Sequence, residues 1–550
     1  MLQKVWLRES VVLIGLVVVI TLLCLPLLMM GPQSGHSFFF NLSWTKGFAE
    51  TVAEGVFYPR WLPHMHQEAG SPVFFYYAPF PYYLTTLGRL LCHECTISQH
   101  LGFGMWLIML LSGLAFYIFA RQHVRHVPAL VSTFFYIILP YHFYIDLLQR
   151  QAIGETSVYI FMPLALLAVK RLSDGLGWVA GVAVAFAMTL FSHLPGTLLF
   201  SPFLFLYAVL IAYKMGNWRS MLPRFMSGIV LGILLSGIYL IPALTLQEYI
   251  HFQKWWSYDY YHFMRWFIFG SVDSRNPQML QDLKELLSAV TILTGLLVWS
   301  AGRKQRNQTP WILFLIGSWF FMTSISAWLW DLLPILQKVQ FPFRTAIIFD
   351  LAIALIIMQA LAAISCEHPI RLAIATGICV ALCLVSLHKI HDEYRNQLHL
   401  STDKNNQNQI HSVIATGFDA PEYLPQTVKE YRHSPFKVQI VDKNGTFRVE
   451  KWISRHIVLQ MDLPEPAKII VHQFYFPGWQ AQIADSTQCL TASTPDGLIQ
   501  VNAPAGQYRL HLTLKKVPAE QVGAIASLIG LTGILILLAI GIQKRIIKKT

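Results

Sequence analysis

Hydrophobic residues along this chain are concentrated in long runs, and polar segments separate them. Most runs approach the roughly 20 residues that an α-helix needs to cross a bilayer. Because lipid offers backbone N–H and C=O groups no partners, each run is expected to form a helix. The pattern predicts a polytopic α-helical membrane protein with about 12 transmembrane helices, at residues 10–30, 100–120, 127–145, 155–170, 177–192, 195–213, 225–243, 284–301, 310–330, 345–364, 370–388 and 521–543.

The segment 389–520 has a different pattern. It opens with a strongly polar stretch at 391–409, which we expect to be a loosely ordered entry. Short stretches in which apolar and polar residues alternate then follow, and turn residues separate them. This alternation predicts a small antiparallel β-domain of the sandwich type. The predicted strands are FKVQIV, TFRVEKW, HIVLQMDL, KIIVHQFYF, LIQVNA and YRLHLTL.

These patterns divide the chain into three parts. Residues 1–388 form a transmembrane domain with a long outer loop at 31–99, residues 389–520 form the β-rich domain, and residues 521–550 form a last helix and a basic tail. The first hydrophobic run could also be a signal peptide. Pro26 and the lack of an A-x-A-like cleavage site favour a retained helix.

Composition agrees with a membrane protein and explains the basic charge. The chain has 550 residues, of which 55% are hydrophobic and 13% are charged, against about 25% charged in soluble proteins. The net charge is +12, and 17 cations lie at the two termini and in alternate segments between the hydrophobic runs. The positive-inside rule therefore predicts both termini in the cytoplasm of a bacterial inner membrane, the long polar segments outside, and no nucleic-acid partner. The inner cations are Lys4, Arg8, Arg121, Arg125, Lys170, Arg171, Lys214, Arg219, Arg224, Arg303, Lys304, Arg306, Arg371, Lys544, Arg545, Lys548 and Lys549.

The cysteines indicate one local disulfide. Cys92 and Cys95 form a CHEC sequence on the outer side, where the compartment is oxidising. A disulfide is favoured over a zinc site because a zinc ribbon needs a second cysteine pair. Cys489 is left without a partner. The cysteines inside hydrophobic runs are apolar filler: Cys24, Cys379 and Cys383.

The outer loop at 31–99 contains an amphipathic helical pattern. One apolar stripe can lie flat on the membrane, and it consists of Trp44, Phe48, Val52 and Val56. A second face carries charged residues at the same four-residue spacing: Lys46, Glu50 and Glu54. This face is either a solvated surface with an ion pair or part of a functional site.

His64, His66 and Glu68 alternate in the same loop. On an extended loop, alternate side chains point the same way, as metal ligands do. Loops rich in histidine are commonly just polar, so these residues are only weak candidates for a divalent metal ion. No other cofactor is indicated.

Several further stretches carry a resemblance to a known group of proteins. In chain order they are YPRWLP, GSPVFFYYAPFPYYL, LLQRQAIGE, SHLPGTLL, VQFPFR, EYLP and FYFPGW. With them the chain resembles bacterial multi-pass proteins that are similar to the GT-C class of glycosyltransferases. Many of these carry the label "6-pyruvoyl-tetrahydropterin synthase-related membrane domain", although nothing in the residues suggests a pterin enzyme.

The resemblance implies a GT-C-like fold and transfer of a sugar from a polyprenyl-phosphate donor at the outer face. It also implies an acid in the first outer loop as catalytic base, with an aspartate directly after the histidine of a Gly-His pair. Here the sequence is Gly35-His36-Ser37. A serine cannot act as that base, so this chain departs from the pattern at its catalytic position.

The reaction itself needs a base for the acceptor hydroxyl and cations for the departing phosphate. The nearest remaining carboxylates in the first loop are Glu50 and Glu54, and His36 is a possible substitute. A surface acid or a hydrogen-bonded histidine is the structural alternative for each of them.

Three arginines are candidates for the phosphate, because the planar guanidinium suits it. Arg60 lies beside Tyr58 in YPRWLP, and Arg344 begins the tenth predicted helix, where anchoring at the lipid headgroups is the alternative. Arg150 and Glu155 lie at the outer mouth of two helices, where they either bind substrate or form a network with Asp146. His193, at an outer helix end, is a further candidate, with a structural hydrogen bond as the alternative.

The sequence therefore predicts a membrane glycosyltransferase that moves a sugar from a polyprenyl-phosphate donor to a glycan or lipid acceptor. Two alternatives remain. One is a catalytically silent homologue that binds lipid-linked glycan, and the other is a flippase or carrier. Transporters usually show inverted repeats with sites at mid-membrane, whereas the polar residues of this chain gather at one face.

Overall fold

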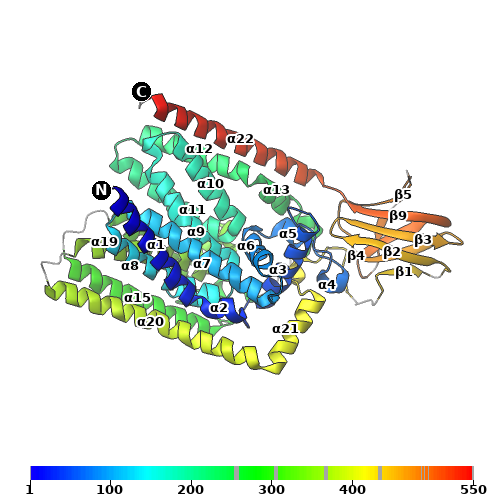
Figure 1. Cartoon of the computed structure of the whole chain (residues 1–550), viewed down its shortest axis with the longest axis horizontal. Helices are drawn as coiled ribbons and strands as arrows, with labels where there is room; N and C mark the ends of the chain where they lie inside the picture. The colour runs from blue at the N-terminus through cyan, green and yellow to red at the C-terminus, as the bar shows by residue number, and fades with distance from the viewer. Residues whose placement is uncertain are drawn as a thin grey trace.

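The computed structural model describes residues 2–252, 259–302, 308–364, 369–431, 436–441, 443–484, 486–488, 490–493 and 495–547. Some residues discussed above lie outside this description: Arg303, Lys304, Arg306, Cys489, Lys548 and Lys549. A helical bundle makes up most of the molecule, and a β-domain projects from one end of it (Figure 1). Both termini lie at the opposite end of the bundle.

The bundle has the length and polarity of a multi-pass membrane protein. Within the described residues, 8 helical segments are long and apolar enough to cross a membrane, or up to 9 if one pair bent by 69° counts as one span. That pair is α12 (Trp218–Leu235) and α13 (Gly237–Thr245). The others are α7 (Ile97–Arg121), α8 (His126–Ile138) with η1 (Tyr141–Gln149), α9 (Ile153–Lys170), α11 (Leu194–Lys214), α15 (Pro277–Ala301), η7 (Pro342–Thr345) with α19 (Ala346–Ala363), α20 (Pro369–Thr402) and α22 (Pro518–Ile547).

The remaining three predicted spans fall on further apolar helices outside this set. They are α1 (Leu2–Leu23), which α2 (Leu25–Met30) follows, α10 (Gly177–Ser192) and α16 (Thr309–Met322). The prediction of a multi-pass helical protein is confirmed, with fewer full-length spans than about 12.

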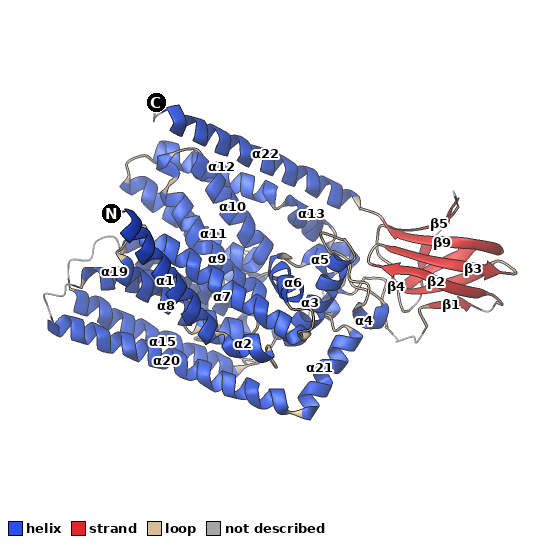
Figure 2. Ribbon diagram, in the orientation of Figure 1, coloured by secondary structure: helices blue, strands red, loops and turns tan. Residues whose placement is uncertain are grey.

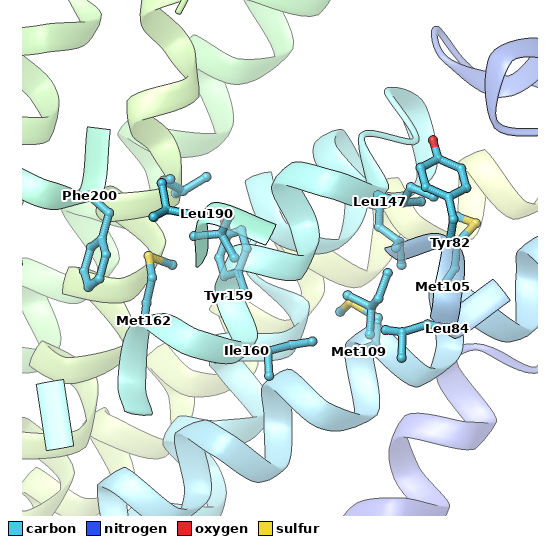
Figure 3. Close-up of a cluster of buried hydrophobic side chains, with 14 of the residues drawn as sticks. Tyr82, Leu84, Met105, Met109, Leu147, Tyr159, Ile160, Met162, Leu190 and Phe200 are labelled. Carbon is cyan, nitrogen blue, oxygen red and sulfur yellow. The ribbon is translucent and has the colours of Figure 1, made fainter. Parts of the chain in front are cut away.

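One buried apolar core runs through the bundle. Figure 3 shows part of it, where side chains of α7, η1, α9, α10 and α11 meet those of α6 (Phe80–Leu91). Helix α19 is buried along most of its length, whereas α22 and α20 lie along opposite sides of the bundle (Figure 1). The apolar side chains that these outer helices expose suit contact with lipid.

The polar stretch after residue 388 is helical, so the expected loosely ordered entry is wrong. Helix α20 continues to Thr402, and α21 (Lys404–Thr416) follows after Asp403. The Asp403 carboxylate accepts hydrogen bonds from the N–H groups of Asn405 and Asn406, which is a helix N-cap. Gln397 of α20 also accepts a hydrogen bond from the backbone N–H of Gln33 at 2.6 Å, so tertiary contacts hold this segment.

The β-domain consists of two antiparallel sheets (Figure 2). One sheet has the order β1 (Val438–Val441), β4 (Ala467–Phe474), β8 (Leu498–Ala503) and β7 (Leu490–Ala492). The other has the order β2 (Thr446–Ile453), β3 (His456–Leu463), β9 (Gly506–Leu514), β5 (Trp479–Ile483) and β6 (Ser486–Gln488). Strand β3 buries Ile457, Leu459, Met461 and Leu463, as expected for a strand with period-two alternation.

The first outer segment lies between the bundle and the β-domain (Figure 1). It contains α3 (Phe38–Ala53), α4 (Met65–Glu68), α5 (Val73–Tyr76) and α6. Trp44 and Phe48 of α3 are almost fully buried, against the rings of Phe74 and Tyr82. The apolar stripe therefore packs inside the protein and not on the membrane surface.

Two covalent or hydrogen-bonded links hold this segment. The predicted disulfide between Cys92 and Cys95 is present. The Trp61 indole donates a hydrogen bond to the side-chain oxygen of Gln473 at 2.8 Å, and Gln473 in turn donates to the carbonyl of Pro63 at 2.9 Å. The two hydrogen bonds of Gln473 fix the β-domain on the outer segment.

Candidate functional site

A cavity of about 560 Å³ lies where the outer ends of several bundle helices meet the first outer segment. Its walls come from the N-terminus of α3, the ends of α10 and α11, helix α13, α18 (Pro334–Gln337), η7 and the turn η8 (Pro421–Tyr423). The polar residues that line it are His36, Ser37, Asn41, Arg150, His193, Thr197, Ser201, Gln247, Lys338, Gln340, Arg344 and Glu422.

A buried network of charges forms the polar end of this cavity. The Arg150 guanidinium lies 2.6 Å from Asp146 and 3.0 Å from Glu155. Glu155 also lies 3.0 Å from the Arg344 Nε and accepts a 2.6 Å hydrogen bond from Tyr141. Two cations and two carboxylates thus compensate each other inside the protein, which buried charges require.

The segment that carries Asp146 and Arg150 has an unusual local structure. Residues Tyr141–Gln149 form a π-helix directly after Pro140, and π-helical turns are frequent at functional sites. Asp350 of α19 accepts a 2.8 Å hydrogen bond from the backbone N–H of His142, at the start of this π-helix. Asp350 therefore supports the element that places Arg150 in the cavity.

Both arginines keep part of their guanidinium available. Arg150 uses Nη1 for its bonds to Tyr141, Asp146 and Glu155. Arg344 uses Nε for Glu155 and Nη1 for the carbonyl of Val339. The Nη2 groups of both side chains have no hydrogen-bond partner within the described residues, and both side chains line the cavity. Fixed guanidinium groups with unused N–H donors suit an anion such as a phosphate.

The histidines predicted from the sequence also line this end. The backbone N–H groups of His36 and Ser37 donate to the carbonyls of Gln149 and Arg150, so the start of α3 is fixed beside the arginines. Desolvation and the Arg150 charge lower the pKa of His36. His193 accepts the N–H of Gly196 at Nδ1, so its neutral form carries the proton on Nε2 as a further donor.

The other end of the cavity is apolar and faces the lipid. Leu244 and Ile335 are each 54% exposed, and Ile233 is 43% exposed. These residues are exposed at the surface while they also line the cavity, so the cavity reaches the surface beside α13 and α18. The apolar lining consists of Phe186, Leu190, Leu194, Leu198, Ile233, Leu240, Leu244 and Ile335.

Among the described residues, Glu422 is the carboxylate that lines the cavity, and it was not a candidate from the sequence. It is 5% exposed and lies in η8 between Pro421 and Tyr423. The sequence feature that could have indicated Glu422 is its position between Pro421 and Tyr423. Trp44 and Tyr77 of the first outer segment, with a ring-centroid separation of 4.7 Å, line the same part of the cavity.

Glu50 and Glu54 do not line this cavity. They line a separate polar depression of about 460 Å³, together with Lys46, His64, Glu68 and Arg89. The Glu54 carboxylate accepts a 2.8 Å hydrogen bond from the backbone N–H of Ser454, and burial raises the pKa of Glu54. Helix α3 therefore separates these two carboxylates from Arg150 and Arg344.

Arg60 and Tyr58 do not line the cavity either. The Arg60 Nε lies 3.0 Å from Glu520 at the start of α22, and its Nη2 donates to the carbonyl of Ile238 in α13 at 2.6 Å. Its guanidinium lies 4.1 Å from the Tyr58 ring centroid. These contacts correspond to the structural pairing that the sequence left open, and they connect the last helix to α13.

The weak metal candidates are not brought together. His64 pairs with Glu68 at 2.9 Å, and this hydrogen bond raises the pKa of His64. The His66 ring packs against Phe474 of the β-domain, with a ring-centroid separation of 5.6 Å. The expected extended loop is a short helical turn, in which His66 and Gln67 have positive φ, so the side chains do not alternate. No group of three or more metal-ligating side chains occurs in the described part of the chain.

Comparisons with known proteins add two structural likenesses. No family model and no curated protein sequence matches the chain. The arabinofuranosyltransferase AftD from Mycobacteria is similar with a TM-score of 0.43 and 13% identity, over 71% of this chain and 27% of that one. ArnT from Cupriavidus metallidurans bound to undecaprenyl phosphate is similar with a TM-score of 0.39 and 14% identity, over 74% of this chain and 77% of that one. The chain spans about a quarter of the length of AftD.

The charge network gives a prediction for stability. Replacing Glu155 with leucine leaves two buried guanidiniums without their shared partner, so we expect a loss of about 3–5 kcal/mol in the free energy of unfolding. Denaturant unfolding of the purified protein in detergent measures this loss. Glu285→Leu, at an exposed position of α15, is the matched control and should change stability by about 0.5 kcal/mol or less. Equal stability of both variants would contradict the network as described.

Proposed function

We propose that this chain is a membrane glycosyltransferase that uses a polyprenyl-phosphate sugar as donor and a glycan or lipid as acceptor. The observation that carries the proposal is the two-ended cavity. Arg150 and Arg344 offer unused N–H donors at one end, and exposed apolar side chains line the other. An amphiphile with a phosphate head and a hydrocarbon tail matches both ends.

In this proposal the arginines bind the phosphate that leaves. The acceptor hydroxyl oxygen forms a bond to the anomeric carbon of the donor, and the bond from that carbon to the phosphate oxygen breaks. The phosphate takes the electron pair of the broken bond. Negative charge therefore grows on its oxygens, where Arg150 and Arg344 stabilise it. Glu155 and Asp146 keep both guanidiniums oriented before the donor arrives.

Glu422 is the proposed general base. A carboxylate in the cavity wall can accept the proton of the acceptor hydroxyl as that oxygen attacks. Glu422 lines the same cavity as both arginines, whereas Glu50 and Glu54 line another depression. Trp44, Tyr77 and the neighbouring Tyr423 supply aromatic faces for the sugar rings. This assignment replaces the first-loop aspartate that the resemblance implies and Ser37 cannot supply.

The membrane orientation completes the proposal. The basic segments place both termini in the cytoplasm, and the cavity lies at the opposite end of the bundle, beside the β-domain. Transfer then occurs at the outer face of a bacterial inner membrane. The β-domain projects from the same end of the bundle, where it can hold an acceptor.

Transfer of a labelled sugar tests the proposal. The purified chain in lipid vesicles is incubated with radiolabelled polyprenyl-phosphate sugars extracted from bacterial membranes and with cell-envelope glycans or lipids as acceptors. We expect label in an acceptor and release of polyprenyl phosphate. Binding of the donor without product would instead indicate a silent homologue. Movement of unchanged donor across the vesicle membrane would indicate a carrier, and either result overturns the proposal.

A further inference from the structure

A second carboxylate, Asp419, lies directly behind the cavity wall. It occupies the connection between α21 and η8 and is 6% exposed. It does not line the cavity itself, but the residues that follow it do, including Ala420 and Glu422. Asp419 was not a candidate from the sequence, and neither the charge network nor the proposed chemistry uses it.

Three donors from separate parts of the chain converge on this carboxylate. The Trp44 indole N–H donates to Oδ1 at 3.0 Å, and the backbone N–H of Ala420 donates to Oδ1 at 2.7 Å. The hydroxyl of Ser71 donates to Oδ2. Trp44 belongs to α3, and Ser71 precedes α5. Asp419 thus joins two walls of the cavity, the one with Trp44 and the one with Glu422.

We infer that Asp419 is a positioning residue for sugar transfer, and that its ionised carboxylate holds Trp44 and the 420–423 segment in their places. This inference rests on the proposed function. All three partners donate hydrogen bonds, and a carboxylate accepts them more strongly than a neutral carboxyl group does. Protonation therefore weakens the link between Trp44 and the segment that carries Glu422.

The surroundings of Asp419 favour a protonation change near neutral pH. Burial raises the pKa of Asp419 to about 7, against the hydrogen bonds from Ser71, Ala420 and Trp44, which lower it. The neighbouring charge of Glu422 raises it further. The other titratable groups that face it are Tyr82 of α6, Tyr423 of η8 and His66 of α4.

His66 provides the place for the proton. Its Nε2 lies 3.9 Å from Asp419 Oδ2 and is buried without a hydrogen-bond partner in the described part of the chain. Burial lowers the pKa of His66 to about 4, so its ring is neutral at pH 7 and can accept a hydrogen bond. A protonated Asp419 has this acceptor for its O–H, but Ser71 then loses its charged partner.

The pH dependence of transfer tests the inference. With a midpoint near 7, the ionised fraction of Asp419 rises about tenfold between pH 6 and pH 8. We expect kcat/KM of the wild type to rise by about this factor. Asp419→Asn, which cannot ionise, should be active at a lower, nearly constant level. Asp462→Asn, at an exposed position of β3, is the matched control and should keep the wild-type profile.

A second variant separates positioning from mere folding. Ser71→Ala removes one donor that stabilises the ionised form, so the midpoint of the activity profile should move to higher pH. If Asp419→Asn keeps the wild-type pH dependence, or Ser71→Ala leaves the midpoint unchanged, the inference is overturned.

Infrared difference spectra make failure of this inference distinguishable from failure of the proposed function. A protonated-carboxyl band should disappear from the wild-type protein between pH 6 and pH 8 and be missing from Asp419→Asn, with no substrate present. If this band is seen but no sugar is transferred, the proposed function fails while Asp419 still titrates. If transfer occurs but the band is absent, the role of Asp419 fails alone.

Discussion

Replacing Glu422 with glutamine is expected to lower kcat by about 10²–10⁴-fold, which is the usual contribution of a general base. Glutamine is close in size and can still accept hydrogen bonds, but it cannot take the proton of the acceptor hydroxyl. Because Arg150 and Arg344 provide the donor contacts, the affinity for the polyprenyl-phosphate donor should stay within about twofold. Single-turnover transfer and donor binding, measured on the same preparation, check both expectations.

Glu50→Gln and Glu54→Gln are the matched controls for this prediction. Both change a carboxylate of the outer segment, but these side chains line the other depression. We expect near-normal kcat for each. Full activity of Glu422→Gln together with inactive Glu50→Gln or Glu54→Gln would move the catalytic base to the first outer loop and contradict the cavity as the reaction site.

Replacing Arg344 with lysine is expected to weaken donor binding by about 10- to 100-fold, the equivalent of one hydrogen bond to a charged group. Lysine keeps the positive charge beside Glu155 but lacks the planar group that reaches Glu155 and the phosphate together. Equilibrium binding of a radiolabelled polyprenyl phosphate to the protein in nanodiscs measures this change.

Arg509→Lys is the matched control, because Arg509 pairs with Glu450 on the exposed surface of the β-domain. Its donor affinity should equal that of the wild type. Unfolding in detergent shows whether Arg344→Lys is folded. A folded Arg344→Lys variant with wild-type affinity would rule out phosphate binding at this end of the cavity.

Much of the fold was predictable because its helices and strands follow from the pattern of apolar and polar residues. Long apolar runs indicated the bundle, and alternation indicated β1, β2, β3, β4, β8 and β9. The strands β5, β6 and β7 were missed; β6 and β7 have three residues each, too few to show an alternation. The helical stretch after residue 388 was also missed, because its order comes from the Asp403 cap and from contacts such as Gln397 with Gln33.

The candidate site was predictable only where charge occurs at a helix end. The structure brings His36, Arg150, Glu155, His193 and Arg344 to one cavity, and each of them lies at such an end. Glu155 belongs to the cavity through its contacts with both arginines. Whether the other candidates line the cavity depends on which face of their segment points into it. Packing against distant parts of the chain determines that face.

Helix α3 illustrates this limit. Its N-terminal residues line the cavity, while Glu50 in its last turn and Glu54 directly after it line the other depression. Arg60 pairs with Glu520, a residue more than 400 positions away in the sequence. No local pattern indicates such a partner. Glu422 and Asp419 reach the site through the fold of α21 and η8, for the same reason.

A structure of the protein in nanodiscs with a bound polyprenyl phosphate tests the central claim most directly. We predict the phosphate within hydrogen-bond distance of Arg150 and Arg344, and the hydrocarbon tail leaving the cavity between α13 and α18 beside Leu244 and Ile335. A phosphate bound in the depression with Glu50 and Glu54, or an empty cavity at saturating ligand, would contradict the account.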